Sequence, residues 1–217
     1  MSPRTKAQNE EIRKQRTQEI LQAAIHVYAE KGYVAAEIGE VAEQAGLARG
    51  LVYHYFKNKQ ILFRELYEYM MDRTQRFTQS HFEQEGSSLE LFSQYARIVC
   101  TQVLDDPAVS RFYMRVSMDV HYFYTDEPFS PFEWMKSFLQ PMTQAVEKGI
   151  IQKTIRQGNA SLMAMQFWGA ISQGMNYLDK LQQDLLAQGS LELTMKEQLE
   201  MLLEQVIESA VAVVRPQ

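Results

Sequence analysis

The sequence predicts an all-α protein, with an N-terminal three-helix domain of the helix-turn-helix type followed by a larger helical domain. Three observations predict this class. Apolar residues recur at helical spacing, and no stretch alternates apolar and polar residues for a strand's length. No proline occurs between Arg4 and Asp106, so a long helical stretch is allowed there. Within it, two short segments of helical pattern flank a turn that contains glycine.

Four helices are predicted in the first part of the chain. Ile20, Ala24 and Val27 share one face of the first helix, and Gly32 supplies a left-handed stop. The apolar pattern delimits the next three, the last of which carries Leu66 on its apolar side. The predicted bounds are residues 11–31, 38–45, 49–56 and 60–81.

Start and stop signals divide the second part of the chain. Ser88 follows a glycine-containing turn and is predicted to cap a helix. Asp106-Pro107 is a further helix start, and two prolines indicate a loop over residues 122–131. Gly149 ends the helix after this loop, and Gly189-Ser190 separates the last two. Besides the helix that starts at Asp106-Pro107, the predicted bounds are residues 89–104, 132–148, 160–187 and 193–214.

The composition is that of a globular protein. The 217 residues are 46% hydrophobic and 23% charged, which excludes collagen-like and disordered classes. Cys100 is the single cysteine and the four histidines stand far apart, so no disulfide, metal or cofactor is expected. No run approaches the roughly 18 apolar residues of a membrane span. A cytoplasmic protein with no membrane partner is expected.

The segment from Ile38 to Phe56 has the pattern of a helix-turn-helix. Ala42 and Gly46 provide a small residue where the helices cross and a glycine where the chain turns. Six residues are predicted to point both helices into one core: Ile38, Val41, Ala45, Leu47, Val52 and Tyr55. The outward residues of the second helix are Arg49, Gly50, Leu51, Tyr53 and His54, with Lys57 and Lys59 following. In helix-turn-helix proteins, this second helix enters the DNA major groove.

The outward residue types suit DNA recognition. Arg49 can bond guanine or phosphate, Tyr53 and His54 can bond phosphates or bases, and Leu51 can touch a thymine methyl. Residues 1–60 hold nine Lys and Arg against seven Glu, whereas the remainder holds 13 basic against 20 acidic residues. This asymmetry favours DNA contact at the N-terminal end. The alternative is an α-hairpin inside a bundle, with a charged face that contacts only solvent.

Residues 16–66 contain four motifs: Ile20-Leu21-x-Ala23-Ala24, Tyr28-x-x-x-Gly32-Tyr33, Val41-Ala42-x-x-Ala45-Gly46 and Gly50-x-x-Tyr53-His54-Tyr55-Phe56-Lys57-Asn58-Lys59. In these motifs the segment resembles the TetR family of bacterial transcriptional regulators. Ala36, Ala48 and Leu51 stand where the family usually has Thr, Ser and Thr. The first two changes are expected to remove helix caps or hydroxyls that contact phosphate. Residues 1–60 are the expected DNA-binding domain, and residues 61–217 the expected ligand-binding and dimerisation domain.

Basic residues precede the first predicted core residue: Arg4, Lys6, Arg13, Lys14 and Arg16. They form either an arm that follows the DNA minor groove or phosphates, or a disordered tail.

Aromatic and methionine side chains are dense between residues 112 and 138 and again after residue 162. Most such side chains are expected in the core. The others are expected to line an adaptable pocket for a bulky lipophilic or aromatic effector. The candidate ligand-binding residues are Tyr95, Phe112, Met118, His121, Tyr122, Trp134, Phe138, Phe167, Gln173 and Asn176. Asp119, Asp126 and Glu133 are either contacts for a cationic ligand or solvated surface residues.

The resemblance implies a homodimer formed through the last two helices. Gly169, Ala170 and Gly174 allow close backbone approach in the penultimate helix. The last helix has an apolar stripe that an isolated helix pair would expose: Leu199, Leu202, Val206, Ile207 and Ala210.

The sequence therefore predicts a ligand-responsive regulator that binds double-stranded DNA, most simply a repressor released from a palindromic operator by a small molecule. The alternative is an all-helical small-molecule-binding or interaction protein whose DNA-binding head is degenerate, as Ala36, Ala48 and Leu51 suggest. An enzyme is not expected, because no nucleotide-binding glycine motif, nucleophile motif or metal cluster is present.

Overall fold

The computed structural model describes residues 5–125 and 130–216, and these residues form helices and connecting turns without a strand. Two compact units are present. Unit 1 consists of residues 1–71 and 111–128, and unit 2 consists of residues 72–110 and 129–217. Two helices, α4 (Lys59–Phe82) and α6 (Pro107–Phe123), each continue from one unit into the other.

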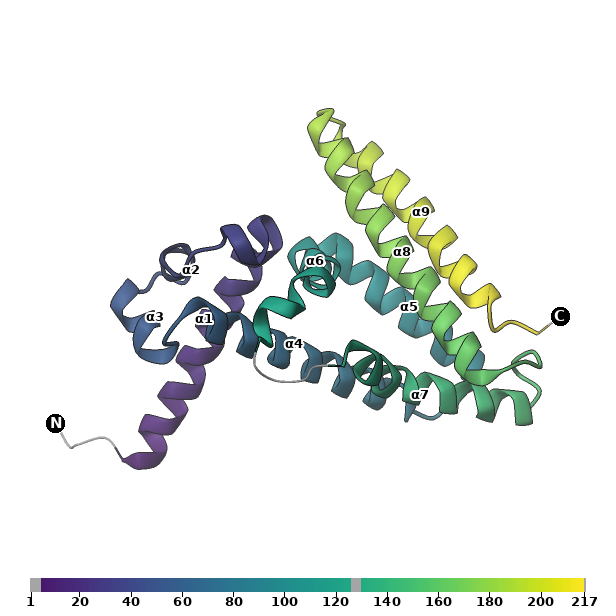
Figure 1. Cartoon of the computed structure of the whole chain (residues 1–217). Coiled ribbons are helices and arrows are strands. Elements are labelled where there is room, and N and C mark those ends of the chain that lie inside the picture. The colour runs from purple at the N-terminus through teal and green to yellow at the C-terminus, as the bar shows by residue number, and fades with distance from the viewer. Residues whose placement is uncertain (1–4, 126–129, 217) are drawn as a thin grey trace. The chain divides into compact units, whose positions relative to one another are not determined.

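Unit 1 contains α1 (Lys6–Ala35), α2 (Ile38–Gln44), α3 (Arg49–Tyr55), the first half of α4 and most of α6 (Figure 1). Its core is closed by α6. The ring of Tyr28 on α1 lies 5.4 Å from that of Phe63 on α4 and 5.2 Å from that of Phe112 on α6. All three side chains are buried. The expected boundary at residue 60 therefore does not coincide with the division by packing, because residues 61–71 and much of α6 complete the core of the N-terminal unit.

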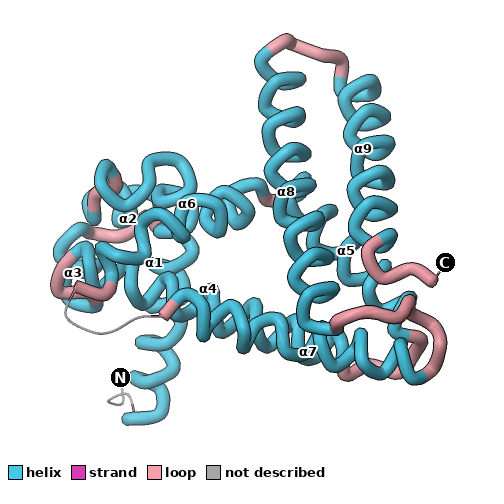
Figure 2. The backbone as a smooth tube through the Cα atoms, turned by 45° about the vertical axis from the view of Figure 1, so that its right-hand side comes forward, coloured by secondary structure: helices cyan, strands magenta, loops and turns pink. Residues whose placement is uncertain are grey.

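Unit 2 contains the rest of α4 together with α5 (Ser88–Asp105), α7 (Pro131–Ile151), α8 (Ala160–Ala187) and α9 (Glu192–Ala212). Figure 2 shows α8 and α9 running side by side, and α5 packs against α7, α8 and α9. Buried aromatic residues fill the centre, with the rings of Phe92 and Phe167 4.6 Å apart. Burial raises the pKa of the Cys100 thiol to about 12, so this thiol remains protonated and unreactive.

Most helix bounds agree with the sequence prediction, and α8 spans the predicted residues 160–187. The first helix starts earlier than predicted. Thr5 and Gln8 form a reciprocal capping box, so residues expected to form an arm or tail are helical from Lys6 onward. Gly32 has the predicted positive φ, of 71°, but the helix continues beyond this kink to Ala35.

Two further predictions for the second part of the chain are corrected. Ser87, not Ser88, caps α5, because its hydroxyl accepts the amide N–H of Glu90 at 3.3 Å while Ser88 is buried. The predicted loop over residues 122–131 is shorter at both ends, since α6 runs to Phe123 and α7 begins at Pro131. Arg4, Asp126 and Pro128 lie outside the described residues. No helix within the described ranges has both the length and the apolar character to cross a membrane.

Candidate nucleic-acid interface

A small shared core holds α2 and α3 against the rest of unit 1. Ile38, Val41, Ala42, Val52 and Phe56 are at most 2% exposed, so both helices are anchored along one side. Three other residues predicted for this core are only half-buried: Ala45, Leu47 and Tyr55. The opposite side of α3 is thereby left to solvent.

The turn between α2 and α3 depends on Gly46. Its φ of 64° lies in the left-handed region, and its amide donates to the carbonyl of Glu43 at 3.0 Å. The amide of Leu47 then donates to the carbonyl of Ala42 at 2.9 Å. No atom lies within 4 Å of the position of a Cβ at Gly46, so the requirement for glycine is conformational rather than steric.

The solvent-facing side of α3 presents most of the residues predicted to contact DNA. Arg49, Gly50, Tyr53 and His54 are exposed, and Leu51 is half-buried. The Arg49 Nη2 donates to the Tyr53 hydroxyl at 3.5 Å, and its guanidinium carbon lies 5.7 Å from the centre of that ring. No atom lies within 4 Å of a Cβ placed at Gly50, which leaves room for another molecule to approach the backbone.

The two lysines after α3 differ in their surroundings. Lys57 is exposed. Lys59 donates from Nζ to the carbonyl of Val34 at 2.8 Å, and this ammonium lies 4.9 Å from the ring centre of Tyr33. Lys59 therefore ties the start of α4 to the end of α1, and it has fewer free donors for a phosphate than the sequence suggested.

Ala48 and Ala36, the two positions where a helix cap is predicted to be missing, also differ in their surroundings. Ala48 is the N-cap residue of α3 and provides no side-chain bond, as predicted. Ala36 precedes the N-cap of α2 by one residue, is fully buried, and donates its amide to the carbonyl of Gly32. Ala36 therefore does not lie at the N-cap of α2, and the prediction that it removes a cap of this helix was wrong.

Replacing Ala48 by serine is expected to stabilise unit 1 by about 1 kcal/mol, because the new hydroxyl can accept an unsatisfied amide at the start of α3. Urea denaturation followed by circular dichroism measures the gain. Ala48→Gly is the control and should give a smaller gain, since glycine adds no acceptor; an equal gain would show that the cap is not the cause.

A carboxylate on α6 joins the turn that leads into α2. Asp119 Oδ2 accepts the hydroxyl of Tyr28 at 2.8 Å and the backbone amide of Tyr33 at 3.0 Å. A Cβ at Gly32 would lie 3.3 Å from a guanidinium nitrogen of Arg115, so α6 approaches this turn closely. Asp119 is thus neither a free ligand contact nor a solvated residue. Sequence reasoning missed its role because 91 residues separate it from Tyr28.

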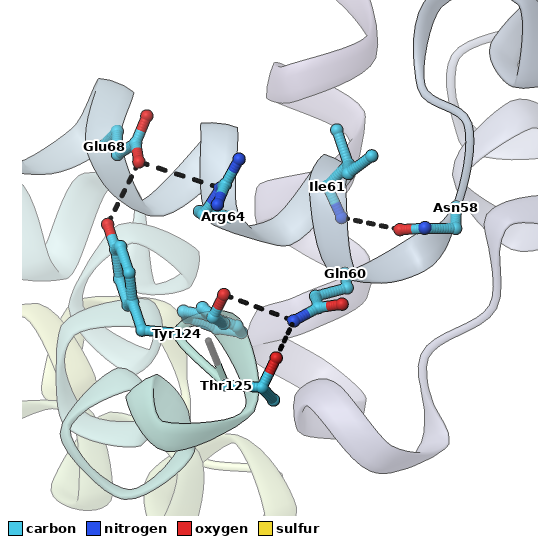
Figure 3. Close-up of polar contacts among 8 residues, drawn as sticks. Asn58, Gln60, Ile61, Arg64, Glu68, Tyr124 and Thr125 are labelled. Carbon is cyan, nitrogen blue, oxygen red and sulfur yellow. Dashed lines mark hydrogen bonds and ion pairs between the residues drawn. The ribbon is translucent and has the colours of Figure 1, made fainter. Parts of the chain in front are cut away.

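A second set of polar contacts joins the end of α6 to the start of α4 (Figure 3). Asn58 caps α4 through the amide of Ile61 at 2.9 Å. The next residues contact the α6 end: Gln60 Nε2 donates to the Thr125 hydroxyl at 3.1 Å, and the Tyr124 hydroxyl donates to Glu68 at 3.1 Å. The helix that follows α3 is therefore held by α6 at several points.

The structure divides the predicted ligand-binding residues between the two units. In unit 1, Phe112 is part of the core, and Tyr122 stacks on Tyr33 with ring centres 5.0 Å apart. Met118 is 68% exposed and His121 is also exposed. The other six lie in unit 2: Tyr95, Trp134, Phe138, Phe167, Gln173 and Asn176. The ten residues therefore do not form one pocket within either unit.

Some of the six predicted ligand-binding residues in unit 2 lie close to one another. The ring of Phe138 stacks on Trp134 at 5.3 Å, and the rings of Tyr95 and Phe167 are 6.4 Å apart. Gln173 is exposed and Asn176 is half-buried. A separate groove of about 240 Å³ between α4 and α7 has a mostly polar lining, which includes none of the ten. Within the described residues, no group of three or more His, Cys, Asp or Glu side chains is placed to hold a metal ion.

Comparison with known proteins gives sequence matches to the part of the chain that contains α2 and α3. Residues 20–66 match the model of "Bacterial regulatory proteins, tetR family". Over 68 residues the chain is 37% identical to the HTH-type transcriptional regulator AcrR of Shigella flexneri, which covers 31% of this chain. The chain spans about 30% of the length of that relative.

Solved structures extend the similarity in fold to nearly the whole chain. A TetR-family regulator from Marinobacter aquaeolei VT8 has a TM-score of 0.67 and 18% identity, covering 96% of this chain and all of the other. FadR from Bacillus subtilis, in complex with stearoyl-CoA, has a TM-score of 0.59 and 19% identity, covering 88% of this chain and 98% of the other. The fold and the site define a helix-turn-helix protein with a C-terminal helical domain. The match to the tetR family model, over residues 20–66, includes both helices of the helix-turn-helix, α2 and α3.

Proposed function

We propose that this protein is a homodimeric transcriptional regulator, a repressor that binds a palindromic operator through α3 and is released when a small molecule binds unit 2. The observation that carries the proposal is the exposed side of α3. Arg49, Tyr53 and His54 project from a short helix that is fixed by the buried Val52. Rigid support and exposed hydrogen-bonding side chains are what reading base edges in a major groove requires.

The proposed dimer uses α8, one of the two helices that the sequence suggested, rather than the apolar stripe on α9. Leu199, Ile207 and Ala210 of the predicted stripe are buried within unit 2 itself, and Gly174 serves the packing of α8 on α9. Exposed residues instead recur at helical spacing along α8: Leu162, Met165, Gln173 and Tyr177, with the half-buried Gly169 among them. Leu162, Met165 and Tyr177 are each at least 50% exposed. Exposed apolar side chains that gather on one side of a helix are typical of an interface.

The proposed effector is a bulky lipophilic or aromatic molecule. The rings of Trp134, Phe138 and Trp168 lie within about 5 Å of their neighbours in unit 2 and offer apolar contact area. The structurally similar FadR is bound to stearoyl-CoA, which supports an effector with a long apolar part. Effector binding would weaken DNA binding only if the effector prefers a conformation in which the paired α3 helices do not match one helical turn of DNA, about 34–36 Å.

A footprint on the DNA flanking the protein's own gene, taken at two salt concentrations, tests the proposal. A salt-sensitive footprint with a palindromic centre is expected, and sedimentation velocity should give a dimer. If neither this DNA nor sequences selected from the whole genome bind, the proposal fails. The alternative, a small-molecule-binding protein with a degenerate head, would then be favoured.

Arg49→Ala is expected to weaken operator binding about 10- to 100-fold, because a bidentate contact with guanine contributes roughly 1–3 kcal/mol. Fluorescence anisotropy with labelled operator DNA measures the change. Arg73→Ala is the matched control, since Arg73 is an exposed arginine in the unit 2 part of α4. A similar loss in both variants would show that overall charge, rather than the α3 contact, determines affinity.

A further inference from the structure

The guanidinium of Arg49 lies over the start of α2. A Cβ at Gly39 would be 3.7 Å from the guanidinium carbon and from Nη1 of Arg49, and 3.8 Å from its Nε. Three atoms of one plane at nearly equal distances place that Cβ position against the flat face of the guanidinium. Because Gly39 is the second residue of α2 and Arg49 the first of α3, this contact joins the two helices. Gly39 therefore provides the space in which the arginine head group lies.

Tyr53 contacts the same guanidinium from one turn further along α3. The Nη2 of Arg49 donates to the Tyr53 hydroxyl at 3.5 Å, and the guanidinium carbon lies 5.7 Å from the ring centre. Residues four apart are neighbours on one side of a helix. The other side of α3 is anchored by the fully buried Val52, so Arg49 and Tyr53 stay on the exposed side. Arg49 is thus held on its flat face by α2 and on one edge by α3.

The donors of Arg49 remain available for DNA. On α2, the carboxylate of Glu40 is already bound to Lys31, and it also accepts the amide of Glu37 at 3.1 Å. This carboxylate therefore has its own partners. A guanidinium carries five N–H donors, of which Tyr53 accepts one. The others are enough for the two parallel bonds that an arginine makes to O6 and N7 of a guanine.

An arginine that is already in place favours specific over non-specific binding. A free arginine side chain loses its freedom when it bonds a base, which weakens binding about two- to tenfold. An operator without the guanine does not immobilise the side chain, so this loss reduces the difference in affinity between the correct and the altered operator. Contacts that hold Arg49 before DNA binds remove part of the loss. Residues 39 and 53 can therefore affect specificity without touching the base.

We propose that Gly39 and Tyr53 are positioning residues, which hold Arg49 so that it selects one guanine in each half of the operator. The proposal rests on the DNA binding proposed above and extends it to the base that is recognised. Arg49 is the residue that contacts the guanine, and the other two act through it. Direct contact between Tyr53 and DNA, without any effect on Arg49, is the alternative.

Two substitutions in the full chain disturb the placement of Arg49 without changing the net charge. Gly39→Leu fills the space beside the guanidinium, and Tyr53→Phe removes the hydroxyl that accepts Nη2. Two controls match the first substitution. In Gly39→Ala, the new methyl group meets the guanidinium only at ordinary contact distance. Gln44→Leu adds the same leucine at an exposed position of α2, about 140° around the helix from Gly39.

Fluorescence anisotropy is measured with the footprinted operator and with operators in which one base pair is replaced in both halves. Arg49→Ala identifies the guanine, as the position at which replacement no longer weakens binding. The discrimination is the ratio of the two dissociation constants at this position, and it should be about tenfold or more for the wild type. Circular dichroism and thermal unfolding verify that each variant is folded.

The discrimination at this guanine should fall by up to about tenfold in Gly39→Leu and by about two- to threefold in Tyr53→Phe. Discrimination at every other position should stay as in the wild type, and both controls should keep the wild-type value throughout. Combined with Arg49→Ala, Tyr53→Phe should cause no further loss of discrimination, because no arginine is left to position.

Three results would overturn the proposal. The first is a loss of affinity that is the same on all operators, or an unchanged discrimination in both Gly39→Leu and Tyr53→Phe. The second is an equal loss of discrimination in Gln44→Leu, and the third is that Arg49→Ala identifies no guanine. Wild-type protein that binds no DNA would instead overturn the proposed function.

Discussion

Asp119→Ala is expected to lower the free energy of unfolding of unit 1 by about 3 kcal/mol, because two donors lose their acceptor at once. The first donor is the hydroxyl of Tyr28, whose side chain is fully buried. The second is the backbone amide of Tyr33, the residue directly after the kink at Gly32. Burial and the hydrogen bond to Asp119 both raise the pKa of Tyr28, so this hydroxyl stays a donor at neutral pH. Urea denaturation followed by far-ultraviolet circular dichroism measures the loss.

Tyr28→Phe separates the two bonds of Asp119. This variant removes one hydroxyl but leaves the bond to Tyr33, so a loss of about 1 kcal/mol is expected. The double variant gives the coupling energy between residues 28 and 119. A coupling near zero, or a loss below about 1 kcal/mol for Asp119→Ala, would show that solvent replaces the carboxylate without cost.

Gly174→Ala is expected to destabilise unit 2 by about 1–3 kcal/mol, because the new methyl group would overlap α9. A Cβ at residue 174 would lie close to Val206, whose Cγ2 is 3.1 Å from that position and whose Cγ1 is closer still. The two helices would have to move apart along the buried Ile171 and Leu203. Thermal unfolding measures the change.

Two further variants identify the cause of that loss. Adding Val206→Ala should restore part of the stability lost in Gly174→Ala, because it removes the overlapping methyl groups. Gly169→Ala, on the same helix, meets no atom within 4 Å and should raise the stability of the monomer by up to about 1 kcal/mol through helix propensity alone. Equal losses at positions 169 and 174 would contradict the packing argument.

The sequence predicted those features that depend on local periodicity. The bounds of α2, α3, α4 and α8 follow from the spacing of apolar residues and agree within about one residue. The exposed side of α3 follows in the same way, since Val52 is the buried residue and Arg49 and Tyr53 lie one turn apart on the other side. A helix of seven residues leaves few alternatives once its buried side is known.

The features that the sequence did not predict depend on contacts between distant residues. Lys59 has the residue type of a phosphate contact, but its bond to the carbonyl of Val34 arises only when α4 meets the end of α1. The predicted apolar stripe on α9 is present, but its spacing alone did not show that α5 and α8 of the same chain pack against this helix. Asp119 has no local signal of any kind, because its partners are Tyr28 and the amide of Tyr33.

The contribution of α6 to the core of unit 1 bears on the transfer of DNA specificity between regulators. Similarity to the family model ends at residue 66, which suggests a DNA-binding module that could be exchanged as one continuous piece. The packing of Phe112 and the hydrogen bonds of Asp119 contradict that expectation, because part of the module's interior comes from a helix that follows α5 in the chain. A graft of the first 66 residues onto another regulator would place Tyr28 and Phe63 against foreign side chains. Chimeras that keep this packing would need two crossovers, so that residues 111–125 are transferred together with the first 66 residues.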